Sequence, residues 1–109
     1  MGHQKPRGST RFAIGEIVQH RLFGYRGVIV DVDASFQMSE EWYTKMAQTR
    51  PPKNQPWYRV LVHGTEQVTY VADRNLEPDH TGEPIQHPLL AQFFNEFQQG
   101  YYSDTRSVN

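Results

Sequence analysis

Residues 24–33 read GYRGVIVDVD and raise the question of which fold this chain adopts. Three interpretations are open: a nucleic-acid clamp on the GxxG spacing of Gly24 and Gly27, a metal site at Asp31 and Asp33, or a hairpin of a small β-barrel. An RNA-binding GxxG clamp needs helices on both sides, and strand-like patterns flank this one. From residue 28 to 33 the three valines alternate with the isoleucine and the aspartates, which predicts a strand with the valines on one face. The stretch therefore indicates a glycine turn followed by a strand.

The two aspartates at the end of this strand are the first candidates for chemistry. Side chains two positions apart on a strand lie about 7 Å apart on one face, so Asp31 and Asp33 could hold a divalent cation or exchange protons. No third acid or histidine follows at a fitting spacing, and the histidines are scattered, at positions 3, 20, 63, 80 and 87. The sequence also contains no nucleophile elbow, P-loop or dinucleotide fingerprint. We therefore expect a protein without catalytic residues or cofactor, and we predict no metal site. The sequence alone leaves open whether the two aspartates hold an ion.

Further strand-like segments surround the opening stretch. Four segments have the composition and alternation of strands: residues 14–20, 57–62, 67–71 and 74–78. Between the second and third strands, residues 39–47 indicate a short helix, which Ser39 can cap and Pro51 can end. Five short strands with one helical insertion predict a mostly β fold, bent into a small barrel.

The C-terminal part of the sequence has a helical pattern instead. In residues 88–97, PLLAQFFNEF, apolar side chains recur four positions apart, the proline suits a first turn, and Gly100 suits a stop. We expect this helix to pack on the barrel. Alternatively, Phe93, Phe94 and Phe97 present a face to a partner protein or to a second copy of the chain. Residues 79–109 are thus expected to form a C-terminal helix and a polar tail.

Composition limits the class of protein. The chain has 109 residues, no cysteine and a formal net charge of −1, which fits a single domain without disulfides. No apolar run reaches the roughly 20 residues of a membrane span. Residues 1–11 lack the apolar stretch of a signal peptide, so we interpret them as a disordered arm or a tag and expect a cytoplasmic protein. Positive charge gathers in residues 1–30 and negative charge in residues 63–109, but the low total argues against a strongly electrostatic DNA binder.

Aromatic residues and arginines occur together in the predicted barrel. Tyr25 and Arg26 lie on the glycine turn, and Arg21 and Arg59 lie on or beside neighbouring strands. Such a surface binds nucleic acids by stacking and by contacts to phosphates. It also suits protein interfaces, where Tyr, Trp and Arg are enriched. The residues alone leave both interpretations open.

Several of these segments together resemble one known family. They are residues 12–15 (FAIG), 24–29 (GYRGVI), 56–60 (PWYRV), 70–72 (YVA) and 75–76 (NL), in this order and spacing, with the two aspartates at 31 and 33. They are similar, over residues 12–78, to the YccV-like family of hemimethylated-DNA-binding domains, which includes the heat-shock protein HspQ. The resemblance implies an SH3-like β-barrel with a helical excursion between the second and third strands, and binding in place of catalysis.

The resemblance also implies two alternative functions. In the first, the protein binds double-stranded, hemimethylated DNA, and we expect Arg21, Arg26 and Arg59 at phosphates and Tyr25 at a groove edge. In the second, it is a stress-linked adaptor that binds the Lon protease or its substrates and promotes degradation, and the phenylalanines of residues 93–97 would contribute the interface. We prefer the DNA-binding hypothesis and leave a homo-oligomer open.

Overall fold

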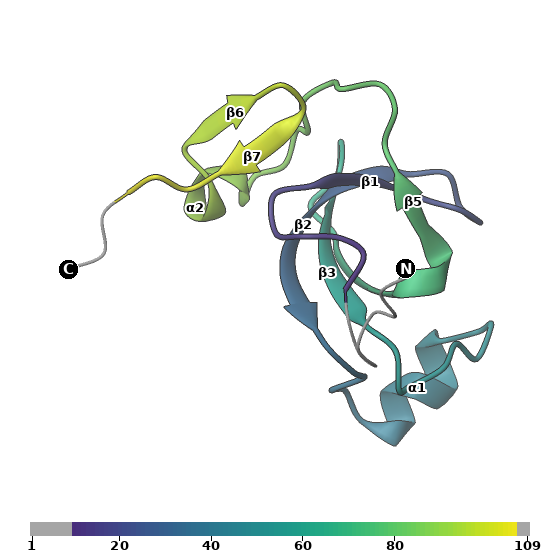
Figure 1. The fold of residues 1–109 in the computed structure, drawn as a ribbon. Coiled ribbons are helices and arrows are strands. Elements are labelled where there is room, and N and C mark those ends of the chain that lie inside the picture. Colours follow the sequence, from purple (N-terminus) through teal and green to yellow (C-terminus); the bar gives the residue numbers. More distant parts are fainter. Residues whose placement is uncertain (1–9, 107–109) are drawn as a thin grey trace, which may run out of the picture.

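The computed structural model describes residues 10–106, which form one curled antiparallel sheet with a small hairpin packed against it (Figure 1). Residues 1–9 of the predicted N-terminal arm lie outside the described part. The large sheet has five strands in the order β4-β3-β2-β1-β5. The strands are β1 (Ile17–His20), β2 (Arg26–Asp33), β3 (Trp57–Val62), β4 (Val68–Ala72) and β5 (Leu76–Pro78). The predicted mostly β fold with five strands is confirmed.

The sheet has two open edges. A one-turn 3-10 helix, η1 (Asp73–Asn75), joins β4 to β5, and these two strands are the edges of the sheet. Among the described residues no ladder pairs β4 with β5. Closure into an SH3-like barrel is therefore not confirmed, and β4 has β3 on one side and no strand on the other.

Both faces of the sheet carry apolar side chains, so the protein has two main cores. The inner core draws on all five strands and contains Phe12, Val18, Ile29, Tyr58, Val60, Val71 and Leu76. The outer core contains Ile17, Val28, Val30 and Leu61 of the sheet, packed with Ile85, Phe94 and Tyr102 from the C-terminal segment. Burial on both faces explains why the strands are rich in valine and isoleucine instead of alternating strictly with polar residues.

Strand β2 contains one irregularity that its alternating sequence does not predict. The pairing with β3 skips Val30, which is an extra residue between Ile29 and Asp31 and forms a β-bulge. The bulge shifts the alternation by one position. Val30 packs in the outer core together with Val28, whereas Val32, which follows the bulge, packs with Ile29 against the inner core. The expectation that all three valines share one face is wrong.

The predicted helical insertion is confirmed as α1 (Glu40–Met46). Ser39 caps it, because its hydroxyl accepts a hydrogen bond from the Trp42 amide at 3.0 Å. The Trp42 ring then packs edge-on against Tyr70, which stacks on Trp57 with 5.2 Å between the ring centres. These aromatic contacts hold the insertion against the ends of β3 and β4.

The predicted C-terminal helix over residues 88–97 is wrong. The chain forms a single helical turn, α2 (Leu90–Phe93), followed by a hairpin of β6 (Glu96–Gln98) and β7 (Tyr101–Ser103). Gln99 and Gly100 both have positive φ, 52° and 81°, as required in the two-residue turns that suit twisted hairpins. Gly100 therefore makes a hairpin turn instead of ending a helix, and part of the expected polar tail is a strand. Within residues 10–106 no helix has the length and apolar character needed to cross a membrane.

Hydrogen bonds as well as the outer core fix this hairpin to the sheet. The Tyr102 amide donates to the Gly15 carbonyl at 2.9 Å, and the Tyr102 hydroxyl accepts from the Ile85 amide at 2.9 Å. Gly15 has a φ of 95°, and a β-carbon there would collide with the Tyr102 carbonyl oxygen. The C-terminal segment therefore packs as part of the same unit as the sheet.

Candidate binding site

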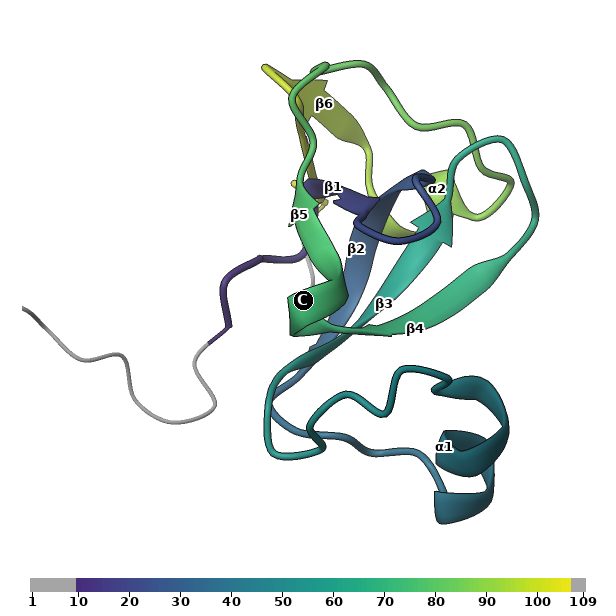
Figure 2. The ribbon, with the colours of Figure 1, turned by 90° about the vertical axis from the view of Figure 1, so that its right-hand side faces the viewer.

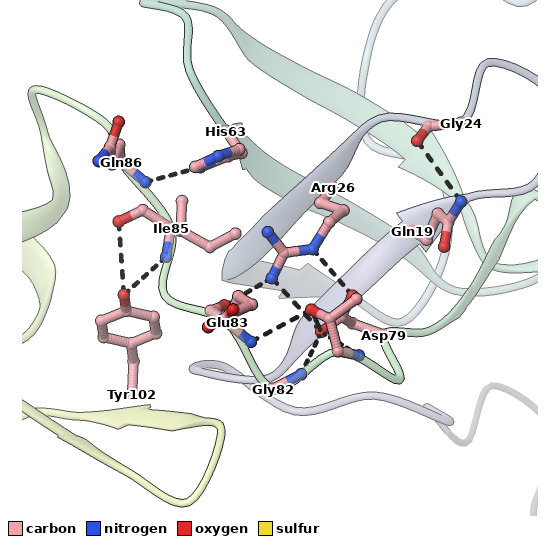
Figure 3. A network of polar contacts seen from close by, with 11 residues as sticks. Gln19, Gly24, Arg26, His63, Asp79, Gly82, Glu83, Ile85, Gln86 and Tyr102 are labelled. Carbon is pink, nitrogen blue, oxygen red and sulfur yellow. Dashed lines mark hydrogen bonds and ion pairs between the residues drawn. The ribbon is translucent and has the colours of Figure 1, made fainter.

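Arg26, predicted to contact a phosphate, is held in a buried ion pair (Figure 3). Its Nε atom lies 2.8 Å from one carboxylate oxygen of Asp79, and Nη2 donates to the Glu83 carbonyl at 2.5 Å. The exposed fraction is 18% for the Arg26 side chain and 2% for that of Asp79. These contacts tie the start of β2 to the segment that follows β5.

The Asp79 carboxylate is charged and has several donors. Burial by itself raises the pKa of Asp79, but hydrogen bonds from Arg26, Thr81 and Gly82 outweigh burial and hold the pKa below its ordinary value. If Arg26 left this pair to reach a phosphate, a buried carboxylate would lose its counter-charge. The geometry therefore gives Arg26 a role in stability.

Arg59 and Tyr25 also have partners inside the protein. The Arg59 guanidinium lies 3.6 Å from an Asp31 oxygen and 4.9 Å from the centre of the Tyr70 ring. The Tyr25 hydroxyl lies 2.8 Å from the Thr69 hydroxyl, and the Tyr25 ring packs against the inner core. Burial raises the pKa of Tyr25 above its ordinary value, so this hydroxyl is neutral. Arg59 and Tyr25 are thus positioned side chains that border a surface recess.

Arg21 lies with two other arginines around η1, and we call Arg11, Arg21 and Arg74 the η1 arginine cluster. The Arg21 amide donates to the Asn75 carbonyl at 2.8 Å, and among the described residues its guanidinium forms no ion pair. Arg11 pairs with Asp73 at 2.7 Å, while Arg74 belongs to the turn itself and is exposed. Since Asp73 is the only acid of the turn, the cluster has an excess of positive charge.

The three phenylalanines predicted to form a protein-binding face do not share one face of a helix, although the Phe93 and Phe94 rings lie 6.3 Å apart. The helix that would align them does not form, and Phe94 is buried in the outer core with 6% of its surface exposed. Phe93 and Phe97 expose 38% and 36%, and the Phe97 ring packs against Tyr102 at 4.6 Å. A role for these side chains in protein binding stays a prediction.

A groove of about 610 Å³ runs along β4, and we call it the β4 groove. Figure 2 shows β4 as the outer strand, with α1 beneath it. Thr69 and Tyr70 are consecutive residues of β4, so their side chains point to opposite faces. Tyr25 bonds to Thr69 and the Trp42 ring contacts Tyr70, which places two sets of side chains on opposite sides of the strand. The first set is Leu22, Phe23 and Tyr25, the second is Met38, Trp42 and Met46, and residues 67–72 and Arg59 are also part of the lining.

The β4 groove is unusually apolar for an exposed surface. Large exposed fractions belong to Phe23 (71%), Met46 (62%), Leu22 (57%) and Val68 (45%). A concentration of exposed apolar side chains around one recess is typical of a protein- or ligand-binding site. Sequence reasoning missed this groove because its sides come from segments that are distant along the chain. The exposed Leu-Phe pair in the turn before the GxxG stretch was the one available signal.

His20 links the β4 groove to the turn between β1 and β2. Its Nδ1 atom accepts hydrogen bonds from the Leu22 and Phe23 amides, both at 3.1 Å. Only a neutral imidazole with Nδ1 unprotonated can accept them, and burial lowers the pKa of His20 below its ordinary value. The ring also stacks on Phe23 at 4.6 Å. Neutral His20 therefore fixes the two exposed apolar residues of the turn.

The aspartates considered for metal binding have partners within the protein. Asp31 faces Arg59, and Asp33 accepts a hydrogen bond from the Tyr70 hydroxyl at 2.6 Å. Burial and this bond to Asp33 raise the pKa of Tyr70 far above its ordinary value. Within residues 10–106, no three acidic or histidine side chains gather as a metal site would require. The two aspartates orient the arginine and the tyrosine beneath α1.

The fold and these surfaces define a class of protein: a small, mostly β protein with arginines around η1 and an apolar groove along its β4 edge. The family described as "Hemimethylated DNA-binding protein YccV like" matches residues 10–101, and the chain belongs to this YccV-like family. The resemblance noted for residues 12–78 is thereby confirmed, and the match extends into the C-terminal hairpin.

Relatives with this domain include much longer proteins. F-box only protein 21 of Homo sapiens and of Pongo abelii is 34% identical to this chain over 93 residues, and the Mus musculus protein is 33% identical. The match covers 84% of this chain and 15% of each relative. The chain therefore spans about a seventh of the length of these curated relatives.

Proposed function

We propose that the chain is a non-enzymatic protein that binds double-stranded DNA through the η1 arginine cluster. The family's description supports DNA as the ligand. The observation that carries the site is that the Arg21 backbone and the Arg11 side chain both bond to the turn that contains Arg74, and that the single acid of this turn, Asp73, already pairs with Arg11. Arginine contacts phosphate oxygens in a bidentate geometry and so fixes a protein on the duplex. We also propose that the curled sheet is an open form of the SH3-like barrel.

Two exposed side chains next to Arg21 extend this proposal to the methylation state of the DNA. Leu22 and Phe23 follow Arg21 in the chain and are largely exposed. Apolar side chains contact methyl groups of bases in the major groove. We propose that Leu22 and Phe23 contact the methyl group of a hemimethylated site once the arginines hold the backbone.

Fluorescence anisotropy with one labelled duplex in unmethylated, hemimethylated and fully methylated forms tests both steps. We expect the tightest binding to the hemimethylated form. Arg21→Ala and Arg74→Ala should each reduce the slope of log K against log salt by about 0.9, the contribution of one phosphate contact. Phe23→Ala should remove the preference among duplexes without changing the slope. Arg106→Ala is the matched control, because Arg106 pairs with Asp104 in the C-terminal segment.

Two results would refute the DNA-binding proposal. The first is an absence of binding at micromolar protein and low salt. The second is a salt slope that stays unchanged in both arginine variants, which would place the phosphates elsewhere on the protein.

The β4 groove favours a second function. Exposed apolar side chains around one recess suit a protein ligand better than a phosphate backbone, since the centres of protein interfaces are depleted in charge. We propose, as the alternative, an adaptor that promotes degradation of proteins by the Lon protease. A degradation assay with purified protease and a candidate substrate tests it. Faster loss of substrate in the presence of the chain supports the adaptor, and an unchanged rate refutes it.

A further inference from the structure

We propose that β4 binds an extended segment of a partner protein, which adds to the sheet as a sixth strand inside the β4 groove. This proposal rests on the adaptor function in one respect, which is that the ligand is a protein. It names the site, the mode of binding and the chemistry of the segment.

The backbone of β4 offers free hydrogen-bonding groups on its outer side. The Val62 amide donates to the Gln67 carbonyl, and the Asp73 amide donates to the Pro56 carbonyl. These two bonds show which of the residue pairs between β3 and β4 are hydrogen-bonded. In an antiparallel ladder, bonded and non-bonded pairs alternate. Val68 and Tyr70 fall in the non-bonded pairs, so their amides and carbonyls point away from β3 and toward the groove.

The two edge strands of the sheet differ in how they are protected. Strand β5 has three residues and includes a glutamate and a proline, Glu77 and Pro78, two devices that discourage pairing at an edge. Strand β4 has five residues, VTYVA, without charge or proline, and it exposes Val68. An unprotected edge of this kind is a template for an added strand.

The sides of the groove match the two faces of such a strand. Side chains of an added strand point alternately to its two faces. On one face they would meet Leu22 and Phe23 of the turn, and on the other Trp42 and Met46 of α1. Apolar residues on both faces of the segment would cover the apolar side chains that are now exposed.

The charge of the groove specifies the remaining residues of the segment. Among the residues that line the groove, Arg59 is the only lysine, arginine, aspartate or glutamate. At the end nearest η1, Arg74 donates to the Thr49 carbonyl and the Arg21 amide donates to the Asn75 carbonyl, and both acceptors belong to groove residues. The Arg59 side chain is 39% exposed and its pair with Asp31 spans 3.6 Å, so its guanidinium can donate to a carboxylate of the segment as well. The segment is therefore an extended, apolar peptide that carries aspartate or glutamate.

Selection from a phage-displayed library of random twelve-residue peptides tests the proposal. We expect the protein to enrich apolar peptides with acidic residues, and Arg59→Gln to reduce the acidic preference. Val68→Pro removes one outward-facing amide without removing a bond to β3, whereas Val68→Thr keeps the amide and the branched shape. For a synthesised peptide from the selection, we expect about tenfold weaker binding to the proline variant and little change for the threonine variant. Circular dichroism confirms that both variants fold.

Hydrogen exchange on the unmodified chain gives an independent test. Saturating peptide should slow the exchange of the Val68 and Tyr70 amides by about tenfold or more, because both would enter the new ladder. The Thr69 and Val71 amides already bond to β3 and should change less. N-methyl groups on alternate peptide residues should abolish binding when they block the amides that face β4. The same groups moved by one residue, to the amides that face away from β4, should leave binding intact.

Several results would overturn the proposal. They are a selection that enriches no peptide family, a peptide that binds without protecting Val68 and Tyr70, and equal binding by the proline and threonine variants. Protection that rises with protein concentration in the absence of peptide would show instead that a second copy of the chain occupies β4. Peptide binding without any effect on protein degradation would refute the adaptor function and leave this site established.

Discussion

Arg26→Ala should destabilise the protein substantially, because it leaves the buried Asp79 carboxylate without its counter-charge. Removing one partner of a fully buried pair costs about 3–5 kcal/mol. Arg26 is 18% exposed, and Asp79 keeps its hydrogen bonds from Thr81 and Gly82, so we expect about 2–3 kcal/mol. At about 4 °C per kcal/mol for a domain of this size, the melting temperature should fall by about 8–12 °C.

Differential scanning calorimetry of four proteins measures this effect. The wild type and Arg26→Ala give the loss, and Arg106→Ala is the control for an exposed ion pair. The double variant Arg26→Ala/Asp79→Asn removes the unpaired charge but keeps an oxygen for the Thr81 and Gly82 donors, so it should recover more than half of the loss. A fall of less than about 4 °C in Arg26→Ala, or no recovery in the double variant, would contradict our account of the pair.

The dependence of this loss on pH follows from the sign of the Asp79 shift. The pKa of Asp79 is below its ordinary value of 3.8 in the folded protein. The ion pair therefore stabilises the fold above that value, and its contribution is lost as the pH falls through the lower, folded pKa. We expect the melting temperatures of the wild type and Arg26→Ala to converge as the pH is lowered below about 4. A constant gap between pH 7 and pH 3 would show that the charge of Asp79 is not the cause.

Three further predictions concern other parts of the fold. Phe94→Ala should cost about 3 kcal/mol by emptying part of the outer core, and limited proteolysis should then cut the C-terminal hairpin, whereas Phe93→Ala should leave cleavage unchanged. Because the pKa of His20 is lowered from 6.5 in the folded protein, stability should fall as the pH drops below that value; His20→Asn, whose amide oxygen still accepts, should lose this dependence in melting curves. Gln99→Asn should raise the free energy of unfolding by about 0.5 kcal/mol, since asparagine tolerates the positive φ of the turn better than glutamine, and denaturant titration measures it.

The elements that the sequence predicted correctly are those whose signals are local. The Ser39 cap and the acidic first turn define α1, and the alternation of residues 57–62 defines β3. The segment 88–97 failed because a four-residue apolar repeat also occurs in a turn that leads into a hairpin. The cross-strand contact between Phe97 and Tyr102 favours the hairpin over the predicted helix. The local signal for the hairpin was the pair Gln99-Gly100, which forms its turn.

The candidate sites depended on long-range contacts that no spacing reveals. The pairing of Arg26 with Asp79, 53 positions away in the chain, could not be predicted from the spacing of either residue. Arg11 and Arg21 are brought to η1, which contains Arg74, by the Arg11–Asp73 pair and by the bond from the Arg21 amide to the Asn75 carbonyl. The β4 groove exists because β4 is an edge strand of the described sheet, which depends on how all five strands pair.

The bond between Gly15 and Tyr102 has a consequence for how the chain is made. Ribosomes add about 5–20 residues per second, so the stretch from residue 15 to residue 102 takes roughly 4–17 s to synthesise. During that time the outer faces of β1, β2 and β3 lack Phe94 and Tyr102, the side chains that later bury them. Until the hairpin emerges, the outer face of the nascent sheet therefore exposes apolar side chains that the finished fold buries.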